Sequence, residues 1–265
     1  MVTGASAGIG AAFARFLAAR GAAVCLVARR MDRLQQVAQE LQRAHGVRTH
    51  AVAADLAELP AAARAVEECQ RALGAADILI NNAGYGPRGG FVETPWQEHA
   101  AFMQVMMCSY AELMHRTLPH MKAQGYGRVV NVSSLASFAP EQRGSMYGPA
   151  KRFVTSLSRA VAQELQGTGV HVCASCPGFT YSEFHDVMGN RQHMQKLPQW
   201  MWTSAEDVVR RSWDAVEAGR PVEIIGNVNK GIAALCWALP ARVASAIGPK
   251  PLRQRGEPEA FGKGA

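Results

Sequence analysis

Three polar side chains at fixed spacing are suited to acid–base chemistry on an oxygen atom. Tyr147 and Lys151 lie four residues apart in a segment of helical periodicity, so their side chains share one face of a helix. An ammonium group beside a phenol stabilises the phenolate. We therefore expect Lys151 to lower the pKa of Tyr147 and make it a usable acid or base near neutral pH. Ser134 precedes Tyr147 by thirteen residues, and its hydroxyl could hold a carbonyl oxygen by a hydrogen bond.

A glycine-rich run near the start of the chain is suited to binding phosphate groups. The run is Thr3-Gly4-Ala5-Ser6-Ala7-Gly8-Ile9-Gly10, and it stands between a short strand and a helix. Glycines allow a tight turn and let a pyrophosphate approach the N–H groups at a helix N-terminus. In a βαβ unit this run predicts a dinucleotide site. We expect the cofactor to contact Gly4, Ser6, Gly8, Ile9 and Gly10.

Two arginines indicate which dinucleotide binds. Arg29 and Arg30 follow the second predicted strand, and the first acid after that strand is Asp32. In dinucleotide-binding folds an acid near this point holds the ribose 2′-hydroxyl, whereas an arginine suits a 2′-phosphate. A dianionic phosphate gains charge-assisted hydrogen bonds from a guanidinium that a hydroxyl does not match. The pair therefore favours NADP over NAD; a solvated helix start is the alternative.

The elements that must position these side chains alternate along the chain. Short apolar runs rich in β-branched residues are separated by longer segments of helical period. The strands are apolar throughout, which indicates burial on both faces of a parallel sheet. The predicted strands are 23–28, 47–53, 77–80, 128–133, 170–175 and 222–225. The predicted helices are 8–19, 31–45, 60–73, 95–123, 145–166 and 205–218.

This alternation predicts an α/β fold with a doubly wound parallel sheet, a Rossmann-like three-layer sandwich in a single domain. We place the dinucleotide-binding and catalytic domain at residues 1–226 and an apolar and basic C-terminal extension at 227–265. The first strand is unusually short, because the glycine turn leaves only Met1 and Val2 before it. Either the sequence starts late or the sheet tolerates a two-residue strand.

Further motifs follow the later strands, and together they resemble a known family. Asn81-Asn82-Ala83-Gly84 follows the fourth strand, and Pro177-Gly178 follows the sixth. With the glycine turn, Ser134 and the Tyr147–Lys151 pair in this order, residues 1 to about 226 resemble a compact, single-domain short-chain dehydrogenase/reductase. The resemblance implies an NAD(P)-dependent oxidoreductase acting on CH–OH and C=O groups, and a homodimer or homotetramer.

The resemblance also implies roles for individual residues. Tyr147 would donate the proton to the carbonyl, Ser134 would orient that oxygen, and Lys151 would hold the nicotinamide ribose and lower the tyrosine pKa. The adenine would lie beside Asp55 and Leu56, and the nicotinamide beside Pro177, Gly178 and Thr180. The cofactor would also contact Asn82, Ala83, Gly84, Tyr147 and Lys151.

One position departs from the family pattern. The family carries an asparagine thirteen residues before a proline that is here Pro119, and that position is Met106. In the family the asparagine holds a water that links the lysine to bulk solvent, which a thioether does not support in the same way. Proton resupply must take another route, or the enzyme is slow.

The segment after Pro177-Gly178 is dense in large apolar side chains and predicts a substrate lid at about 179–203. It includes Phe179, Tyr181, Phe184, Met188, Met194, Trp200, Met201 and Trp202. Methionines and aromatics suit a bulky apolar ligand, because ligands bind outside the carboxyl ends of the strands. Ordinary core or an oligomer contact is an equal alternative. The apolar segment from Lys230 to Ile247, with its basic flanks, could lie weakly on an anionic membrane surface. Packing on the domain or on a neighbouring subunit is the favoured alternative.

Composition excludes several other classes of protein. The 265 residues include 48% hydrophobic residues and carry a net charge of +7, which excludes a disordered chain. The charge gathers in the C-terminal tail without a nucleic-acid-binding signature, so we expect no nucleic-acid partner. Six scattered cysteines form no disulfide framework, and no secretory signal opens the chain. We therefore expect a cytoplasmic protein. His185 and His193 lack partners at ligand spacing, and we expect no metal site.

The favoured hypothesis is an NADPH-dependent oxidoreductase that reduces the ketone of a bulky apolar substrate, or oxidises the matching secondary alcohol, with Tyr147 as general acid or base. A small-molecule carbonyl or alcohol is then its main partner. The alternative is an NADP(H)-binding regulator or scaffold with little turnover, which Met106 and the short first strand favour. A lipid reductase acting at a membrane surface is a third hypothesis.

Overall fold

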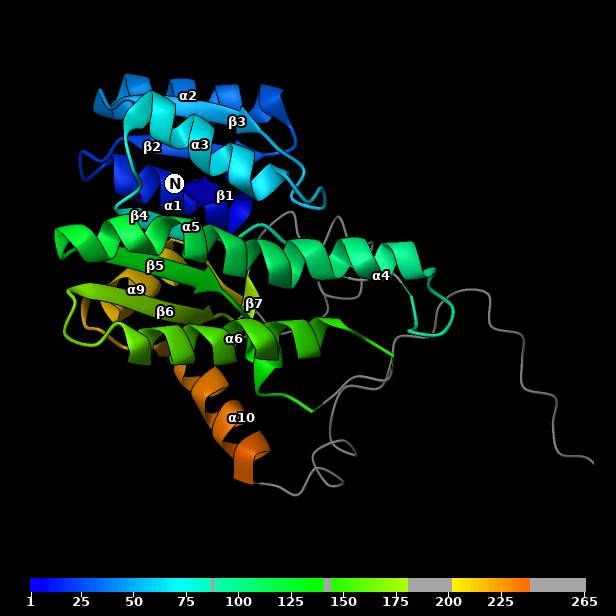
Figure 1. Ribbon diagram of the computed structural model, residues 1–265. Helices are drawn as coiled ribbons and strands as arrows, with labels where there is room; N and C mark the ends of the chain where they lie inside the picture. The colour runs from blue at the N-terminus through cyan, green and yellow to red at the C-terminus, as the bar shows by residue number, and fades with distance from the viewer. Residues whose placement is uncertain (87–88, 141–143, 181–201, 239–265) are drawn as a thin grey trace, which may run out of the picture.

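The computed structural model describes residues 1–86, 89–140, 144–180 and 202–238. Within them, strands and helices alternate as the sequence predicts (Figure 1). The strands are β1 (Val2–Thr3), β2 (Val24–Ala28), β3 (Thr49–Ala53), β4 (Ile78–Asn81), β5 (Gly127–Val132), β6 (Val170–Cys176), β7 (Phe179–Thr180), β8 (Trp202–Thr203) and β9 (Val222–Ile224). The α-helices are α1 (Gly8–Ala18), α2 (Met31–His45), α3 (Ala61–Leu73), α4 (Trp96–Met103), α5 (Ser109–Gln124), α6 (Tyr147–Glu164), α9 (Ala205–Glu217) and α10 (Asn227–Ala238).

The central sheet has seven strands in the order β3-β2-β1-β4-β5-β6-β9, and every pairing in it is parallel. The prediction of a doubly wound parallel sheet is confirmed. Strand order reverses between β1 and β4, and ligands of such sheets bind at this switch point, outside the carboxyl ends of the strands. The short β7 and β8 pair separately.

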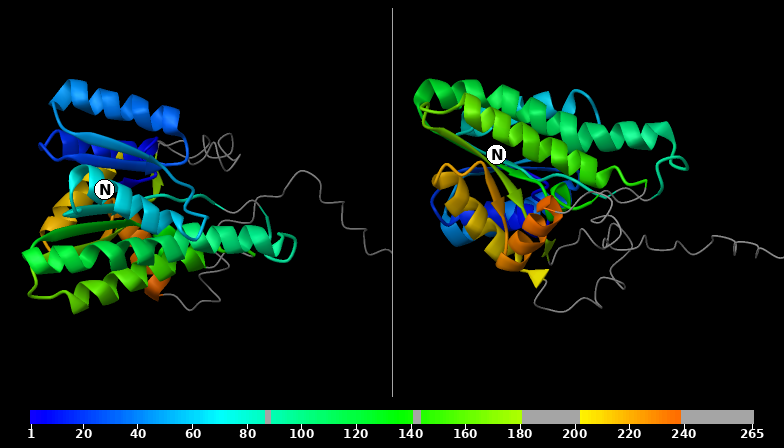
Figure 2. Two further views of the ribbon diagram at one scale, coloured as in Figure 1. Left: turned by 45° about the horizontal axis from the view of Figure 1, so that its top comes forward. Right: turned by 90° about the horizontal axis from the view of Figure 1, so that it is seen from below.

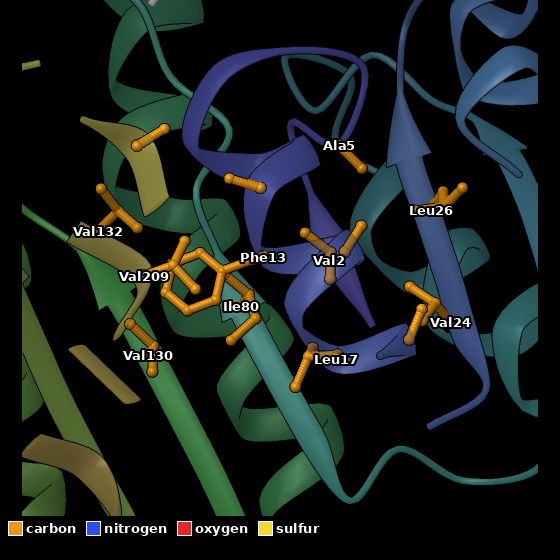
Figure 3. Close-up of a cluster of buried hydrophobic side chains, with 14 of the residues drawn as sticks. Val2, Ala5, Phe13, Leu17, Val24, Leu26, Ile80, Val130, Val132 and Val209 are labelled. Carbon is orange, nitrogen blue, oxygen red and sulfur yellow. The ribbon is translucent and has the colours of Figure 1, made fainter. Parts of the chain in front are cut away.

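Helices cover both faces of this sheet and bury one core on each. One core joins α1, α2 and α9 to the sheet, and the other joins α3, α5 and α6 to the opposite face. Figure 2 shows these layers edge-on. In the first core the Phe13 ring of α1 lies among Ile80, Val130 and Val209 (Figure 3). Burial of each large side chain of this kind stabilises the fold by about 1.5–3 kcal/mol.

The first strand is short, as predicted, and consists of Val2 and Thr3 rather than Met1 and Val2. Val2 is fully buried and pairs with Leu26 of β2 and Ile80 of β4. The backbone nitrogen of Met1 also donates to the Ile78 carbonyl at 2.8 Å. Contacts on both sides therefore hold a two-residue strand in the middle of the sheet.

The long helix predicted at 95–123 is divided in the structure. A π-helical turn, Gln104–Cys108, separates α4 from α5. The residue types of this turn do not mark it, so the sequence pattern predicts one uninterrupted helix. Turns of this kind occur often at functional sites.

The cysteines depart from the expectation in one respect. A disulfide joins Cys25 of β2 to Cys69 of α3, while Cys108, Cys173, Cys176 and Cys236 are free. The two bonded residues are 44 apart in sequence, and their Cα atoms lie 5.8 Å apart because α3 packs on the sheet. Spacing alone does not show that approach. Cys173 and Cys176 are both buried.

Beyond β9 the chain forms α10, the start of the segment predicted at 230–247. Ala233 is buried, while Val228 and Leu235 are about half exposed. In the part of the chain that the structure describes, no helix is both long and apolar enough to cross a membrane. The rest of the extension, 239–265, lies outside the described residues.

Candidate active site

Loops at one edge of the sheet bring the predicted residues together. Each motif begins just after the carboxyl end of a strand, and these ends meet at the same edge of a parallel sheet. The motifs are the glycine turn after β1, Arg29 and Arg30 after β2, Asp55 after β3, Asn82 to Gly84 after β4, Ser134 after β5 and Pro177 after β6.

The three polar side chains form a contiguous group. Ser134 caps the 3₁₀ turn Leu135–Ser137, and its Oγ accepts from the Ala136 N–H at 3.1 Å. Tyr147 begins α6, and its phenol lies near enough to the Ser134 hydroxyl for that group to lower the phenol pKa. Lys151 follows one helical turn later on the same helix. The predicted proximity of serine, phenol and lysine is therefore present.

Lys151 is enclosed by protein. Only 4% of the residue is exposed, and its Nζ donates to the Val132 carbonyl at 2.8 Å. The same nitrogen lies 5.5 Å from the ring centre of Tyr110 and 5.8 Å from that of Tyr147. One backbone carbonyl and two aromatic rings thus hold the ammonium in place.

The pKa shifts differ from the expectation. Burial raises the pKa of Tyr147 to about 12; the Ser134 hydrogen bond opposes this, and the Cys176 thiol adds to it. Burial also lowers the pKa of Lys151 to about 8. The prediction that Lys151 lowers the tyrosine pKa is therefore wrong for the groups of the chain itself. Burial of the phenolate raises the pKa by more than the Ser134 hydroxyl lowers it.

The loop after β4 fixes the glycine turn. Thr3 Oγ1 accepts from the N–H groups of Asn82 and Ala83, at 2.9 and 3.1 Å. In return, Asn82 Nδ2 donates to the carbonyls of Thr3 and Gly4, at 3.1 and 3.3 Å. Two sequence motifs 79 residues apart are thereby locked into one rigid unit.

The turn itself is packed so closely that it requires glycine. Gly4 has a φ of 63°, and a Cβ on Gly10 would lie 2.3 Å from the Gly4 carbonyl oxygen, so a side chain would collide with the backbone. Helix α1 begins at Gly8 with no side-chain cap and no acid in its first turn. Its first N–H groups and positive dipole end suit the pyrophosphate of a dinucleotide. The turn thus fits the predicted cofactor.

The residues predicted to contact the adenosine half border this turn. Arg30 Nη2 donates to Ser6 Oγ at 3.3 Å, and Arg29 and Arg30 are both exposed. Asp55 Oδ1 accepts from the Ala57 N–H at 3.0 Å, while Leu56 is buried. The Arg30 guanidinium therefore contacts the glycine turn itself. The sequence predicted only that Arg29 and Arg30 follow the second strand.

The loop after β6 lies against the segment that carries Ser134. The Pro177 carbonyl accepts from the Leu135 N–H at 2.8 Å, next to Ser134. Thr180 is buried, and its Oγ1 donates to the Gly178 carbonyl at 3.3 Å. Asn229 of α10 lies directly against Gly178. Sequence reasoning missed Asn229, because no motif marks it and the predicted domain end at 226 excluded it.

A second missed residue is Cys176, behind the tyrosine. Its sulfur lies 3.8 Å from Thr155 Oγ1 and 3.9 Å from Ser137 Oγ. Burial raises the pKa of this thiol, so it stays neutral.

The predicted lid lies mostly outside the described residues, which omit 181–201 and with them His185 and His193. At its two ends, the rings of Phe179 and Trp202 lie 5.9 Å apart on the paired strands β7 and β8. Among the residues that the structure does describe, no group of three metal-ligating side chains gathers.

Comparisons with known proteins agree with this geometry. The short chain dehydrogenase family model matches residues 1–193. A 7beta-hydroxysteroid dehydrogenase of Collinsella aerofaciens is 33% identical over 172 residues, which cover 65% of this chain and 65% of that protein. A short-chain dehydrogenase from Sphingobium yanoikuyae, solved in complex with NADPH, is 30% identical with a TM-score of 0.79, covering 98% of both chains. The bulky-bulky ketone specific alcohol dehydrogenase from Comamonas testosteroni is 28% identical with a TM-score of 0.75, covering 98% of this chain and 96% of that one.

Proposed function

This chain belongs to the short-chain dehydrogenase/reductase family, oxidoreductases that act on CH–OH and C=O groups with a nicotinamide cofactor, and we propose that it reduces a ketone with NADPH. The reverse reaction is oxidation of the matching secondary alcohol. One observation carries the proposal. The Tyr147 phenol lies near enough to the Ser134 hydroxyl for that group to lower its pKa, at the edge of the sheet that holds the glycine turn, with Lys151 one helical turn away.

Each of these side chains has a distinct part in the reaction. Ser134 holds the carbonyl oxygen by a hydrogen bond, and Tyr147 gives its phenolic proton to that oxygen. A bound reduced nicotinamide supplies the hydride. Lys151 holds the nicotinamide ribose through its ammonium group. Its contact with the Val132 carbonyl fixes the direction in which the ammonium points.

The pKa values of the pair favour this assignment. Because the pKa of Tyr147 is about 12, the phenol is protonated at neutral pH and is ready to act as an acid. Because the pKa of Lys151 is about 8, its charge is present at neutral pH and is lost above it. Reduction near pH 7 therefore uses a protonated Tyr147 and a charged Lys151.

We assign NADP rather than NAD to the site. Arg30 spans the turn to Ser6, and Arg29 adjoins it on the exposed rim. Both guanidiniums lie at the end of β2, where the 2′ position of a bound dinucleotide is expected. The solved relative in complex with NADPH supports the same choice.

The proposed substrate is a bulky apolar ketone, enclosed by a lid at about 179–203 within a catalytic domain of residues 1–226. The rings of Phe179 and Trp202 and the apolar composition of the segment support it. Two relatives are named for a hydroxysteroid and for bulky-bulky ketones. The contact between Asn229 and Gly178 extends the site beyond 226, to the first turn of α10.

Assembly as a homodimer or homotetramer and a cytoplasmic location complete the proposal. Light scattering of the protein as it leaves a size-exclusion column tests the number of subunits. The Cys25–Cys69 disulfide argues against a cytoplasmic location, because such bonds persist mainly in oxidising compartments. Trapping free thiols in intact cells distinguishes the two redox environments.

A panel of ketones and secondary alcohols, run with NADPH, NADH and their oxidised forms and followed by absorbance, tests the activity. We expect turnover with NADPH on bulky ketones. Tight NADPH binding without turnover on any member of the panel would contradict the enzyme assignment and favour a regulatory binding protein.

A further inference from the structure

The Tyr147 side chain packs against a small apolar cluster that is separate from the two main cores. The cluster consists of Phe102, Met106 and Ala150, with Tyr85 and Met146 beside it. Phe102, Met106 and Ala150 are 2%, 0% and 1% exposed. Tyr147, which is itself only partly buried, therefore has the polar Ser134 on one side and an apolar wall on the other.

Met106 joins the three parts of this wall. It lies in the π-helical turn between α4 and α5, and this turn packs against α6. Its sulfur contacts the loop after β4 so closely that a Cβ on Gly84 would lie 2.8 Å from Sδ. The Phe102 ring completes the wall by meeting the Tyr85 ring edge-on at 5.5 Å. A thioether donates no hydrogen bond and accepts only weakly, so Met106 gives a phenolate no solvation.

The described titratable groups that face Tyr147 are one cation and three neutral side chains. Lys151 of α6 is the one cation among the described groups that face Tyr147. Its Nζ lies 5.8 Å from the Tyr147 ring centre and donates a hydrogen bond to the Val132 carbonyl. The thiol of Cys176 from β6 and the phenol of Tyr110 from α5 are neutral at pH 7, because burial raises the pKa of both. The phenol of Tyr85, after β4, is neutral for the same reason.

We propose that Met106 is a positioning residue that keeps Tyr147 in its protonated form, so that the site reduces carbonyls over a wide pH range and oxidises alcohols only in alkaline solution. The proposal rests on Tyr147 being the proton donor. In reduction the carbonyl carbon gains a hydride from the reduced nicotinamide and the oxygen gains the phenolic proton; water then returns a proton to the phenolate. In oxidation the phenolate takes the hydroxyl proton while the hydride leaves to the oxidised nicotinamide.

The substitution Met106→Asn tests this directly, because an amide solvates the phenolate and admits water to the wall. A catalyst leaves the equilibrium unchanged, so the readout is the pH midpoint of each profile rather than a ratio of rates at one pH. In M106N we expect the midpoints of both pH profiles, the rise of alcohol oxidation and the fall of ketone reduction, to lie about one pH unit below those of the parent. At a pH below both midpoints this corresponds to a tenfold larger phenolate fraction. Met106→Leu keeps the wall apolar and should keep the parent midpoints. Met103→Asn places the same amide three residues away, outside the cluster, and should do so as well.

A second readout does not depend on activity. Absorbance of tyrosinate between pH 8 and 10.5, taken as the difference between each protein and its Tyr147→Phe counterpart, isolates one of the five tyrosines. The parent should show no Tyr147 signal in this range, and M106N should show its onset. Coincident titrations of parent and M106N would overturn the proposal while leaving the proposed function intact. Unchanged turnover in Y147F would instead remove the function on which it rests. If circular dichroism shows that M106N is unfolded, Met106→Gln, close to methionine in length, replaces it.

Discussion

Replacing Arg30 by alanine tests how the site distinguishes two cofactors that differ by one phosphate. Arg30 Nη2 reaches Ser6 Oγ across the glycine turn at 3.3 Å, and we propose that its guanidinium binds the 2′-phosphate. NADH carries a hydroxyl at that position. The substitution should therefore weaken NADPH binding strongly and leave NADH binding almost unchanged.

The size of the effect follows from the kind of bond that is lost. A hydrogen bond to a charged group contributes about 1.5–3 kcal/mol, which corresponds to roughly a 10- to 150-fold change in affinity. Because Arg30 is exposed, solvent and salt screen the interaction, and we expect the lower part of that range. For NADH we expect a change of less than about threefold, since no ionic partner is removed.

Calorimetric titration of NADPH and NADH into the parent and R30A gives the change in affinity for each cofactor. Arg33→Ala is the matched control, because Arg33 is also exposed and lies on the first turn of the same helix, so its loss changes the net charge equally. Raising the salt concentration should shrink the NADPH effect of R30A. Equal losses for NADPH and NADH, or an equal NADPH loss in R33A, would refute the assignment of the phosphate to this arginine.

Two further predictions concern the lysine and the glycine turn. The pKa of Lys151 is lowered to about 8, so its ammonium is present below that pH and lost above it. NADPH affinity should therefore fall by roughly tenfold or more between pH 7 and 9, and Lys151→Arg, which stays charged, should remove the decline; a parallel fall in K151R would assign the pH dependence elsewhere. A Cβ on Gly10 would lie 2.3 Å from the Gly4 carbonyl, so Gly10→Ala should abolish cofactor binding as measured by NADPH fluorescence. Gly231→Ala, in open space on α10, should not; retained binding in G10A would show that the turn is not the cofactor site.

The sequence predicts most of the fold because its local patterns agree with one another. Continuous apolar runs separated by helical periods allow a buried parallel sheet and little else. The glycine turn, the Asn81–Gly84 motif and the Tyr147–Lys151 pair are each short and local, so their positions follow from the order of the strands. Their placement at a single edge of the sheet is a consequence of parallel topology.

The features that the sequence does not predict depend on tertiary packing. The π-helical turn at Gln104–Cys108 lies within one long predicted helix, and its residue types do not mark it. The Cys25–Cys69 disulfide and the contact between Asn229 and Gly178 join residues more than 40 positions apart. Neither pair has a local signature.

The direction of the tyrosine pKa shift shows the same limit at the site itself. Spacing along α6 predicts only that Lys151 is near Tyr147, and a nearby cation alone would lower the phenol pKa. The opposing contribution comes from burial of part of Tyr147 against side chains of α4 and the π-helical turn. A one-dimensional pattern does not give the balance between a neighbouring charge and burial.

The most direct test of the account is the turnover of Tyr147→Phe, measured together with its NADPH affinity. The phenylalanine ring can occupy the same place beside Ser134 and the apolar wall, but it has no proton to give. We predict a loss of ketone reduction by at least about a hundredfold, within the range of general acid catalysis, with NADPH binding within about twofold of the parent. Ketone reduction at the parental rate in Y147F would contradict the account.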